Sequence, residues 1–319
     1  MDQRLRRIVA VLSVILCAVI FIAVVKGSVT IPFMQLLDHD KSAILHLRLM
    51  RILIAVVAGI GLSVSGIVLQ AILRNPLAEP YLLGTSSGAG LGAVIALMVG
   101  LSRIYMPAAA FGGAIASVLL VYNLAQQNNK VKQDSLILSG VVVSVVLSAV
   151  IVFLISISGT VLLHEVTWWL WGSFQVYDPV LLFVVASIVL LGTAALYFFA
   201  QDLNALSLGE EEAVHLGVDI EFVRKILIAI VALITASVVC MCGIIGFVGL
   251  IVPHAMRLLV GSNHKVLIPV TCIASAVFMV LCDTLSRVIM PPVEIPIGVI
   301  TAILGAPAFI ILLKCKSRQ

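Results

Sequence analysis

The apolar residues of this chain gather in long runs, separated by short segments that contain charges, prolines or glycines. A run of about 20 apolar residues is long enough to cross the hydrocarbon core of a membrane as a helix. We therefore predict an all-α polytopic membrane protein with about ten transmembrane helices, forming a single domain over 1–319. The runs cover roughly 8–25, 49–73, 82–100, 105–124, 135–157, 178–200, 223–242, 244–259, 266–286 and 295–313.

One part of this pattern is ambiguous. The stretch 226–260 contains no charged residue before Arg257, so hydropathy alone allows one long helix or two. Gly243, Gly246 and Gly249 favour a tight reversal, because glycine interrupts helices and permits turns. We therefore predict two helices here.

Composition supports a membrane protein. Of the 319 residues, 62% are hydrophobic and 11% are charged, and the mean hydropathy is +1.24. Soluble domains carry about 25% charged residues, so lipid is the expected solvent for much of this surface. The six cysteines lie in or beside the apolar runs without a C-x-x-C pair. We predict neither a metal site nor a disulfide.

The basic residues predict the orientation. Arg4, Arg6 and Arg7 precede the first apolar run, and 314–318 carries three more basic residues. Cytoplasmic segments are enriched in Lys and Arg, so both termini are predicted in the cytoplasm and the number of spans is even. Thirteen of the 19 basic residues then lie inside. The net charge of +4 reflects this bias and does not indicate nucleic-acid binding.

The segment RNPLAEPYLLGTSSGAGLGA at 74–93 combines an irregular turn with the start of an apolar run. Pro76 and Pro80 prevent a continuous helix through the turn. Irregular backbone at membrane depth is stable only where protein covers it or where it lines a cavity. We therefore expect this turn to have a structural partner or a functional role at the cytoplasmic face.

The same segment contains Gly-Thr-Ser-Ser-Gly, which fits the G-x-S-x-G pattern of serine hydrolases. A nucleophile elbow needs a strand, a strained turn, a helix and an oxyanion hole, whereas Ser86 and Ser87 begin an apolar helix. Gly84, Gly88 and Gly92 recur every four residues, which predicts a face for close helix packing. Helix packing is favoured, and an intramembrane serine hydrolase stays an alternative.

Four segments together resemble the permeases of ABC importers for iron–siderophore complexes, haem and cobalamin, the FecCD-like type II importers. Single motifs of this length occur by chance, whereas four in order are specific. Tyr81 and Thr85 depart slightly, because they occupy positions that vary in this family. The segments are RNPLAEPYLLGTSSGAGLGA (74–93), LSLGEEEAVHLGV (206–218), GIIGFVGLIVPHAMRLLVG (243–261) and EIPIGVITAILGAP (294–307).

The resemblance implies a homodimeric permease in a bacterial or archaeal cytoplasmic membrane, with the substrate path along the two-fold axis. Asn75, Pro76 and Leu77 would form a gate at the cytoplasmic mouth. The cargo would be an iron(III)–siderophore, haem or cobalamin, delivered by a periplasmic or lipid-anchored binding protein. An ion-coupled secondary transporter is the alternative, although no relay of intramembrane carboxylates is evident.

Energy must enter through a partner if transport is active. The chain contains no G-x-x-x-x-G-K-[ST] sequence, so it has no Walker A loop and is expected to bind no cofactor. Apolar residues recur at roughly helical spacing in the acidic loop 201–222, which predicts two short helices. The resemblance implies that these couple to two ATPase subunits, which bind ATP and Mg, through Leu208, Gly209, Glu210, Glu211, Ala213, Leu216 and Gly217.

Three arginines lie on the side where basic residues are scarce. Arg48 and Arg51 are three residues apart at the outer start of the second span and share a helix face, and Arg287 ends the ninth span. Snorkelling to the interface explains many such residues. The resemblance implies that they receive carboxylates of the binding protein. Asp283, four residues before Arg287, can neutralise it locally.

Overall fold

The computed structural model describes residues 3–27, 42–102, 104–127, 130–158, 160–175 and 178–316, with only the backbone at 160–163 and 311–316. This part contains thirteen α-helices, a 3-10 helix and a two-stranded hairpin. The elements are α1 (Gln3–Val25), α3 (Ser42–Ile72), η2 (Pro80–Leu83), α4 (Thr85–Met98), α5 (Met106–Ala125), β1 (Gln126–Gln127), β2 (Lys130–Val131), α6 (Gln133–Ser156), α7 (Thr160–Leu170), α8 (Pro179–Phe198), α9 (Ala200–Leu208), α10 (Glu210–His215), α11 (Ile220–Cys242), α12 (Val248–Val260), α13 (His264–Val288) and α14 (Ile297–Lys316).

Each of the ten predicted runs overlaps one of these helices, which confirms the all-α polytopic prediction. In the described residues, α1, α3, α5, α6, α8, α11 and α13 are long and apolar enough to cross a membrane. Helices α4 and α12 have only 14 and 13 residues. That corresponds to about 20 Å of helix, whereas the hydrocarbon core is about 30 Å thick. The spans at 82–100 and 244–259 are therefore shorter as helices than predicted, and irregular backbone precedes both.

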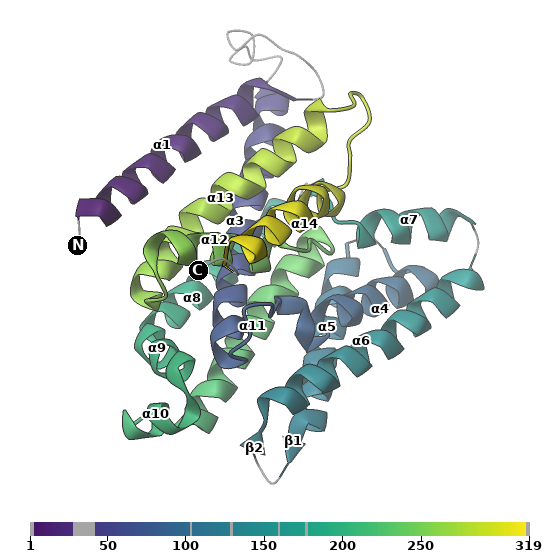
Figure 1. Cartoon of the computed structure of the whole chain (residues 1–319). Coiled ribbons are helices and arrows are strands. Elements are labelled where there is room, and N and C mark those ends of the chain that lie inside the picture. The colour runs from purple at the N-terminus through teal and green to yellow at the C-terminus, as the bar shows by residue number, and fades with distance from the viewer. Residues whose placement is uncertain are drawn as a thin grey trace.

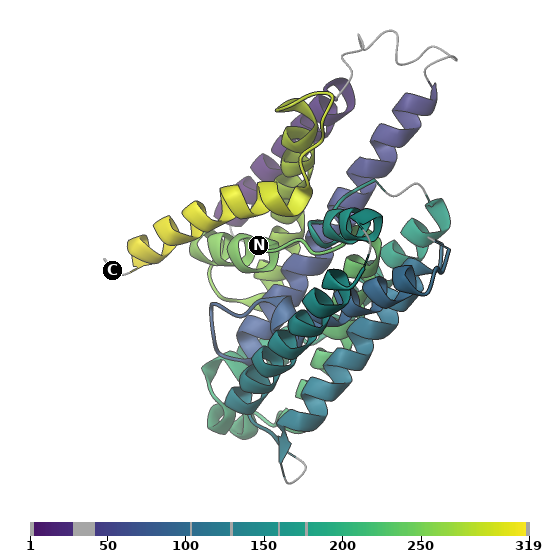
Figure 2. The same cartoon turned by 90° about the vertical axis from the view of Figure 1, so that its right-hand side faces the viewer.

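The centre of the bundle is formed by α3, α11 and α13 (Figure 1). Their most apolar windows are 83%, 72% and 61% buried, compared with 17% in α1 and 22% in α6 and α8. Close packing at the centre depends on small residues. A Cβ atom at Gly59 of α3 would lie 2.7 Å from the carbonyl oxygen of Ser275 in α13. The turned view in Figure 2 shows α14 extending away from this bundle.

The contacts at the two ends of the bundle agree with the predicted topology. At the end predicted to lie outside, Arg48 Nη1 donates to the carbonyl of Val24 at 2.6 Å. Arg287 Nη1 donates to the carbonyl of Lys26 at 3.4 Å. The end of α1, the start of α3 and the end of α13 therefore lie together.

At the opposite end, segments predicted to be cytoplasmic meet. Arg224 Nη1 of α11 donates to the carbonyl of Val131 at 2.6 Å, and Val131 pairs with Gln126 in the β1–β2 hairpin, which the sequence did not predict. The backbone N–H of His264 in α13 donates to Asn204 Oδ1 of α9 at 2.9 Å. Loops predicted to be cytoplasmic therefore contact neighbouring helices at this end of the bundle.

The ambiguous stretch 226–260 contains two helices. Helix α11 ends at Cys242 and α12 begins at Val248. Between them, Gly243 and Phe247 have φ values of 73° and 69°, which break the helical path. The prediction of two helices is confirmed.

Candidate functional site

The turn that joins α3 to η2 is held by its own hydrogen bonds. Asn75 Oδ1 accepts from the backbone N–H of Leu77 at 2.9 Å, and the carbonyl of Asn75 accepts from the N–H of Ala78 at 3.0 Å. Pro76 is exposed, and Leu77 exposes 48% of its surface. The turn therefore presents an apolar side chain outward on a defined backbone.

Two polar side chains join this turn to the irregular segment 243–247. Glu79 Oε1 accepts from the N–H of Phe247 at 2.7 Å. The hydroxyl of Tyr81 donates to the carbonyl of Ile245 at 3.0 Å and accepts from its N–H at 3.1 Å. Buried backbone groups outside helices need such partners. We call Glu79, Tyr81 and 243–247 the interrupted-helix junction.

The interrupted-helix junction connects the irregular segments that precede the two short helices, α4 and α12. Non-helical backbone at membrane depth occurs where protein covers it, and interrupted helices often mark the transport site of a carrier. The hydrogen bonds of Glu79 and Tyr81 therefore attach the motif at 74–93 to the segment 243–247.

Glu79→Gln is expected to be at least as stable as wild type at neutral pH, whereas Glu79→Ala is expected to lose stability. Glutamine keeps an acceptor for Phe247 and removes a carboxyl whose ionised form is disfavoured by burial. Alanine leaves a buried N–H unpaired, which costs about 1–3 kcal/mol. Unfolding in detergent measures the stability of both variants. Equal losses for the two would contradict the role of Glu79 as the acceptor for the Phe247 N–H.

The three glycines that recur in 74–93 lie against α5. A Cβ atom at Gly88 would lie 2.4 Å from the carbonyl oxygen of Gly113, and one at Gly92 would lie 2.2 Å from that of Ala109. Gly84 has a φ of 75°, and a Cβ there would meet a serine hydroxyl of α5 at 2.5 Å. Larger side chains would push α4 and α5 apart.

The hydroxyl groups at the start of α4 are used locally. Ser87 Oγ donates to the carbonyl of Gly84 at 3.1 Å and is buried. Thr85 Oγ1 donates to the carbonyl of Pro80 at 3.2 Å. Both hydroxyl groups donate to carbonyls next to the irregular turn. This favours a role of the segment in helix packing over a serine hydrolase site.

The predicted coupling loop contains two short helices, α9 and α10, as expected from its pattern. Gly209 and Gly217 follow them with φ values of 156° and 83°. Leu208, Val214 and Leu216 expose 63%, 60% and 64% of their surface, although they lie beyond the apolar spans. Large apolar side chains that are exposed outside the membrane are candidates for contact with a partner. We call these three residues the exposed apolar patch.

The structure gives one predicted partner residue in this loop no exposed surface and pairs another within the chain, where its contact with a partner stays a prediction. Ala213 is completely buried within the chain, so it packs inside the loop and offers no surface to a partner. Glu210 Oε1 lies 2.5 Å from Arg224 Nη2, so its carboxylate is already paired. Glu211 is exposed and keeps the role of a polar contact as a prediction.

Two of the three outer arginines, Arg51 and Arg287, form a buried ion-pair cluster, whereas Arg48 donates to the carbonyls of Val24 and Val25. Arg51 bridges Asp283 at 2.9 Å and Glu294 at 2.7 Å, and Arg287 pairs with Asp283 at 2.7 Å. The predicted local pair of Asp283 and Arg287 is thus confirmed. Arg48, Arg51 and Arg287 expose only 5%, 7% and 3% of their surface. Their docking role stays a prediction.

The family model described as the FecCD transport family matches residues 13–315, which is nearly the whole chain. The chain belongs to the FecCD transport family. The resemblance found in the four sequence segments is therefore confirmed.

Relatives of this FecCD permease agree with the match. The cobalamin import system permease protein BtuC of Halobacterium salinarum is 40% identical over 269 residues, or 84% of this chain and 72% of that protein. The Fe(3+) dicitrate transport system permease protein FecD of Escherichia coli is 35% identical over 295 residues, covering 90% and 92%. A solved structure of a metal-chelate type ABC transporter in an inward-facing conformation has a TM-score of 0.88 and 34% identity, covering 97% and 99%. The chain is a multi-pass permease of an ABC importer.

Sequence reasoning on this FecCD permease missed Glu79 and Tyr81. The available signal was a carboxylate and a hydroxyl on either side of Pro80, at the edge of an apolar run. The partner of Glu79 lies 168 residues further along the chain, and that of Tyr81 lies 164 residues further. Linear spacing could not identify those partners.

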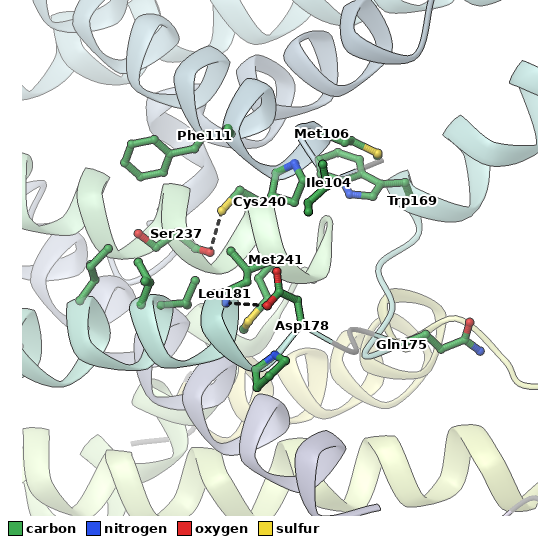
Figure 3. Close-up of a pocket in the computed structure, with 16 residues that line it drawn as sticks. Ile104, Met106, Phe111, Trp169, Gln175, Asp178, Leu181, Ser237, Cys240 and Met241 are labelled. Atoms are coloured by element: carbon green, nitrogen blue, oxygen red, sulfur yellow. Dashed lines mark hydrogen bonds between the residues drawn. The ribbon is translucent and has the colours of Figure 1, made fainter. Parts of the chain in front are cut away.

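A hollow of about 1000 Å³ opens between α5, α8, α11 and the end of α7. Figure 3 shows Phe111, Trp169 and Met241 around it, with Asp178 among the polar side chains. Among the described residues that line it, Asp178 is the only charged one. Its carboxylate caps α8 by accepting from two backbone N–H groups. The hollow therefore offers a mainly apolar surface.

Proposed function

We propose that this FecCD permease carries a metal chelate across the cytoplasmic membrane as the spanning subunit of an ATP-driven importer. The observation that carries the proposal is the family match over 13–315, supported by the likeness to a metal-chelate type ABC transporter at a TM-score of 0.88. Transport of this kind needs a path and two gates and makes no covalent bond. We assign no catalytic residue to the chain.

We place the ATPase partner at the exposed apolar patch. Leu208 and Leu216 are nearly two-thirds exposed on a loop outside the apolar spans, and a partner would bury them. Glu211 lies between them in sequence and is exposed for polar contact. The absence of a Walker A sequence supports a separate subunit that binds ATP and Mg.

We place the substrate path between two copies of the chain. We assign the turn of Asn75, Pro76 and Leu77 as the cytoplasmic gate of this path. Its hydrogen bonds fix the backbone, and Leu77 is half exposed. In a two-fold dimer, a residue near the axis meets its own copy. The hollow near α8 is also mainly apolar, but it lies within one chain.

Leu77→Cys, in a chain from which the six natural cysteines have been removed, is expected to crosslink to its own copy in the resting state. ATP binding or vanadate trapping should change the crosslinking yield, because the gate moves. Glu212→Cys is a matched control, since Glu212 is also exposed at the cytoplasmic end but is not part of the turn. Absence of a crosslink at position 77 in every nucleotide state, with the dimer intact, would place the gate elsewhere.

At the outer end we propose that Arg48, Arg51 and Arg287 attract acidic residues of the binding protein. Charges near an interface act mainly on the association rate of the two partners. The arginines are nearly buried in this structure. Direct contact therefore requires Glu294 to release Arg51.

For the cargo we propose an iron(III)–siderophore first, with haem and cobalamin as the other members of the class. Relatives named for cobalamin, ferric dicitrate and hemin have 40%, 35% and 34% identity, which does not separate the three. The test is to express the binding protein encoded beside the permease and titrate it with each chelate. Tight binding of a single chelate identifies the cargo, and binding of none of the three classes contradicts the proposal.

A further inference from the structure

The segment before α14 closes over Arg51 at the outer end of the bundle. Arg51 Nη2 donates to Asp283, which is completely buried, and Arg51 Nη1 donates to Glu294 at 2.7 Å. The side chain of Glu294 keeps 21% of its surface exposed, compared with 9% for that of Arg51. Both side chains line a narrow surface hollow. Of the two carboxylates, Glu294 is therefore the one on the solvent side of Arg51.

One oxygen of Glu294 connects two parts of the chain. Glu294 Oε2 accepts from Arg51 Nη1 of α3 and, at 2.8 Å, from the amide nitrogen of Gln175, which follows α7. The start of α14 is joined to the end of α7 by its backbone (Figure 1), because the N–H of Ile297 donates to the carbonyl of Gly172 at 3.1 Å. Glu294 therefore attaches α3 to this pair of helix ends. We call Arg51, Gln175 and Glu294 the outer latch.

The outer latch neutralises the charge of Arg51. Two guanidinium groups, those of Arg51 and Arg287, are balanced by the carboxylates of Asp283 and Glu294. An acidic partner that approaches from outside therefore meets a cluster without net charge. Departure of Glu294 leaves one positive charge in excess. An incoming carboxylate restores the balance and accepts from the same nitrogen, so Arg51 keeps a charge-assisted hydrogen bond after the exchange.

The two carboxylates that bind Arg51 differ in how easily they can leave. Asp283 lies inside α13, is completely buried and also pairs with Arg287. Removing it would leave buried charge without compensation. Glu294 lies in the irregular segment between α13 and α14 and is already partly exposed. It can move into water while Arg51 keeps its bonds to Asp283.

We propose that Glu294 is an internal competitor of the binding protein. In the free permease Glu294 occupies Arg51, and in the docked state a carboxylate of the binding protein replaces it there. The exchange also breaks the bond between Glu294 and Gln175, so docking removes this attachment of the α7 and α14 ends to α3. The inference rests on the proposed docking of the binding protein at the outer arginines.

The test measures how tightly the binding protein encoded beside the permease binds the full-length permease in phospholipid nanodiscs, by surface plasmon resonance. Glu294→Gln is expected to strengthen binding about threefold or more, because an amide holds Arg51 less strongly than a carboxylate. Arg51 is then accessible in a larger fraction of the molecules, which raises the apparent affinity by that factor. Arg51→Gln is expected to weaken binding about threefold or more, because the docking guanidinium is lost.

Asp178→Asn is the matched control for a general effect of charge. Asp178 is exposed at the start of α8, at the end predicted to lie outside, and caps that helix. Asparagine keeps the cap and removes the same negative charge. Binding should change less than about twofold, because solvent and salt screen an exposed charge. An equal gain in Asp178→Asn and Glu294→Gln would overturn the proposal.

The double variant Arg51→Gln/Glu294→Gln shows whether Glu294 acts through Arg51. The gain from Glu294→Gln should disappear in the Arg51→Gln background, and a gain of the same size in both backgrounds would overturn the proposal. If Arg51→Gln folds poorly, the comparison of Glu294→Gln with Asp178→Asn still decides. Binding that Arg51→Gln weakens but Glu294→Gln leaves unchanged would overturn internal competition alone. No binding to wild type, or binding unchanged in Arg51→Gln, would overturn the docking proposal as well.

Discussion

Replacing Leu208 and Leu216 with aspartate is expected to abolish binding-protein-stimulated ATP hydrolysis while the permease stays folded. Both side chains are nearly two-thirds exposed in the isolated chain, so the fold does not depend on them. If the ATPase subunit covers them, each leucine contributes about 1.5–3 kcal/mol of apolar burial. Aspartate would in addition bring a charge into that contact. The combined loss corresponds to at least about a hundredfold weaker coupling.

The structure determines which control variants are informative for this experiment. Gln201→Asp introduces the same charge at an exposed position of α9, outside the exposed apolar patch, and should leave hydrolysis unchanged. Glu211→Lys tests the polar contact, whereas Glu210→Lys would place a second cation beside the buried Arg224 and disturb the fold itself. Wild-type stimulation in Leu208→Asp/Leu216→Asp would exclude this loop as the coupling surface.

Asp283→Asn is expected to be the most destabilising conservative change in the outer cluster. Asp283 is fully buried, and its two oxygens contact the guanidinium groups of Arg51 and Arg287 at 2.9 and 2.7 Å. Removing one charge from a buried pair costs about 3–5 kcal/mol, because the partner stays buried without compensation. Here two guanidinium groups lose that compensation. Unfolding by denaturant in mixed micelles measures the change.

Glu294→Gln is the matched control for Asp283→Asn. The side chain of Glu294 is 21% exposed and its amide analogue still accepts from Arg51, so a loss below about 1.5 kcal/mol is expected. Burial acts to raise the pKa of Glu294, but hydrogen bonds from Arg51 and Gln175 outweigh it and keep the pKa below its ordinary value. The contribution of the ionised Glu294 carboxylate to the free energy of unfolding is therefore present above the ordinary glutamate pKa. It is lost as the pH falls through the lower pKa of Glu294 in the folded protein. Equal losses for the two variants would show that Asp283 has no special role.

The hydrophobic pattern predicts most of the fold because lipid imposes a length and a composition on every spanning helix. It overestimates α4 and α12, because hydropathy responds to apolar residues whether or not the backbone is helical. The irregular segments before these helices persist because Glu79 and Tyr81 bond to residues distant in sequence. A linear pattern contains no information on such partners.

The candidate site residues show the same limit. The pairing of Asp283 with Arg287 follows from their spacing of four residues on a helix, and it is present. The pairing of Arg51 with Asp283 spans 232 residues and depends on the packing of α3 against α13. In the cytoplasmic loop, spacing predicts two helices but not that Ala213 faces inward while Leu208 and Leu216 face outward. Position along the chain thus predicts neighbours on one helix and leaves contacts between helices open.

We propose that the chain imports a metal chelate with energy from ATP hydrolysed by a partner. The most direct measurement is uptake of a labelled chelate into proteoliposomes that contain the permease and the ATPase encoded beside it. The loaded binding protein is added outside, and Mg-ATP is enclosed. We predict uptake that requires both ATP and the binding protein and that is unaffected by ionophores that collapse ion gradients. Uptake driven by an ion gradient without ATP would contradict the account.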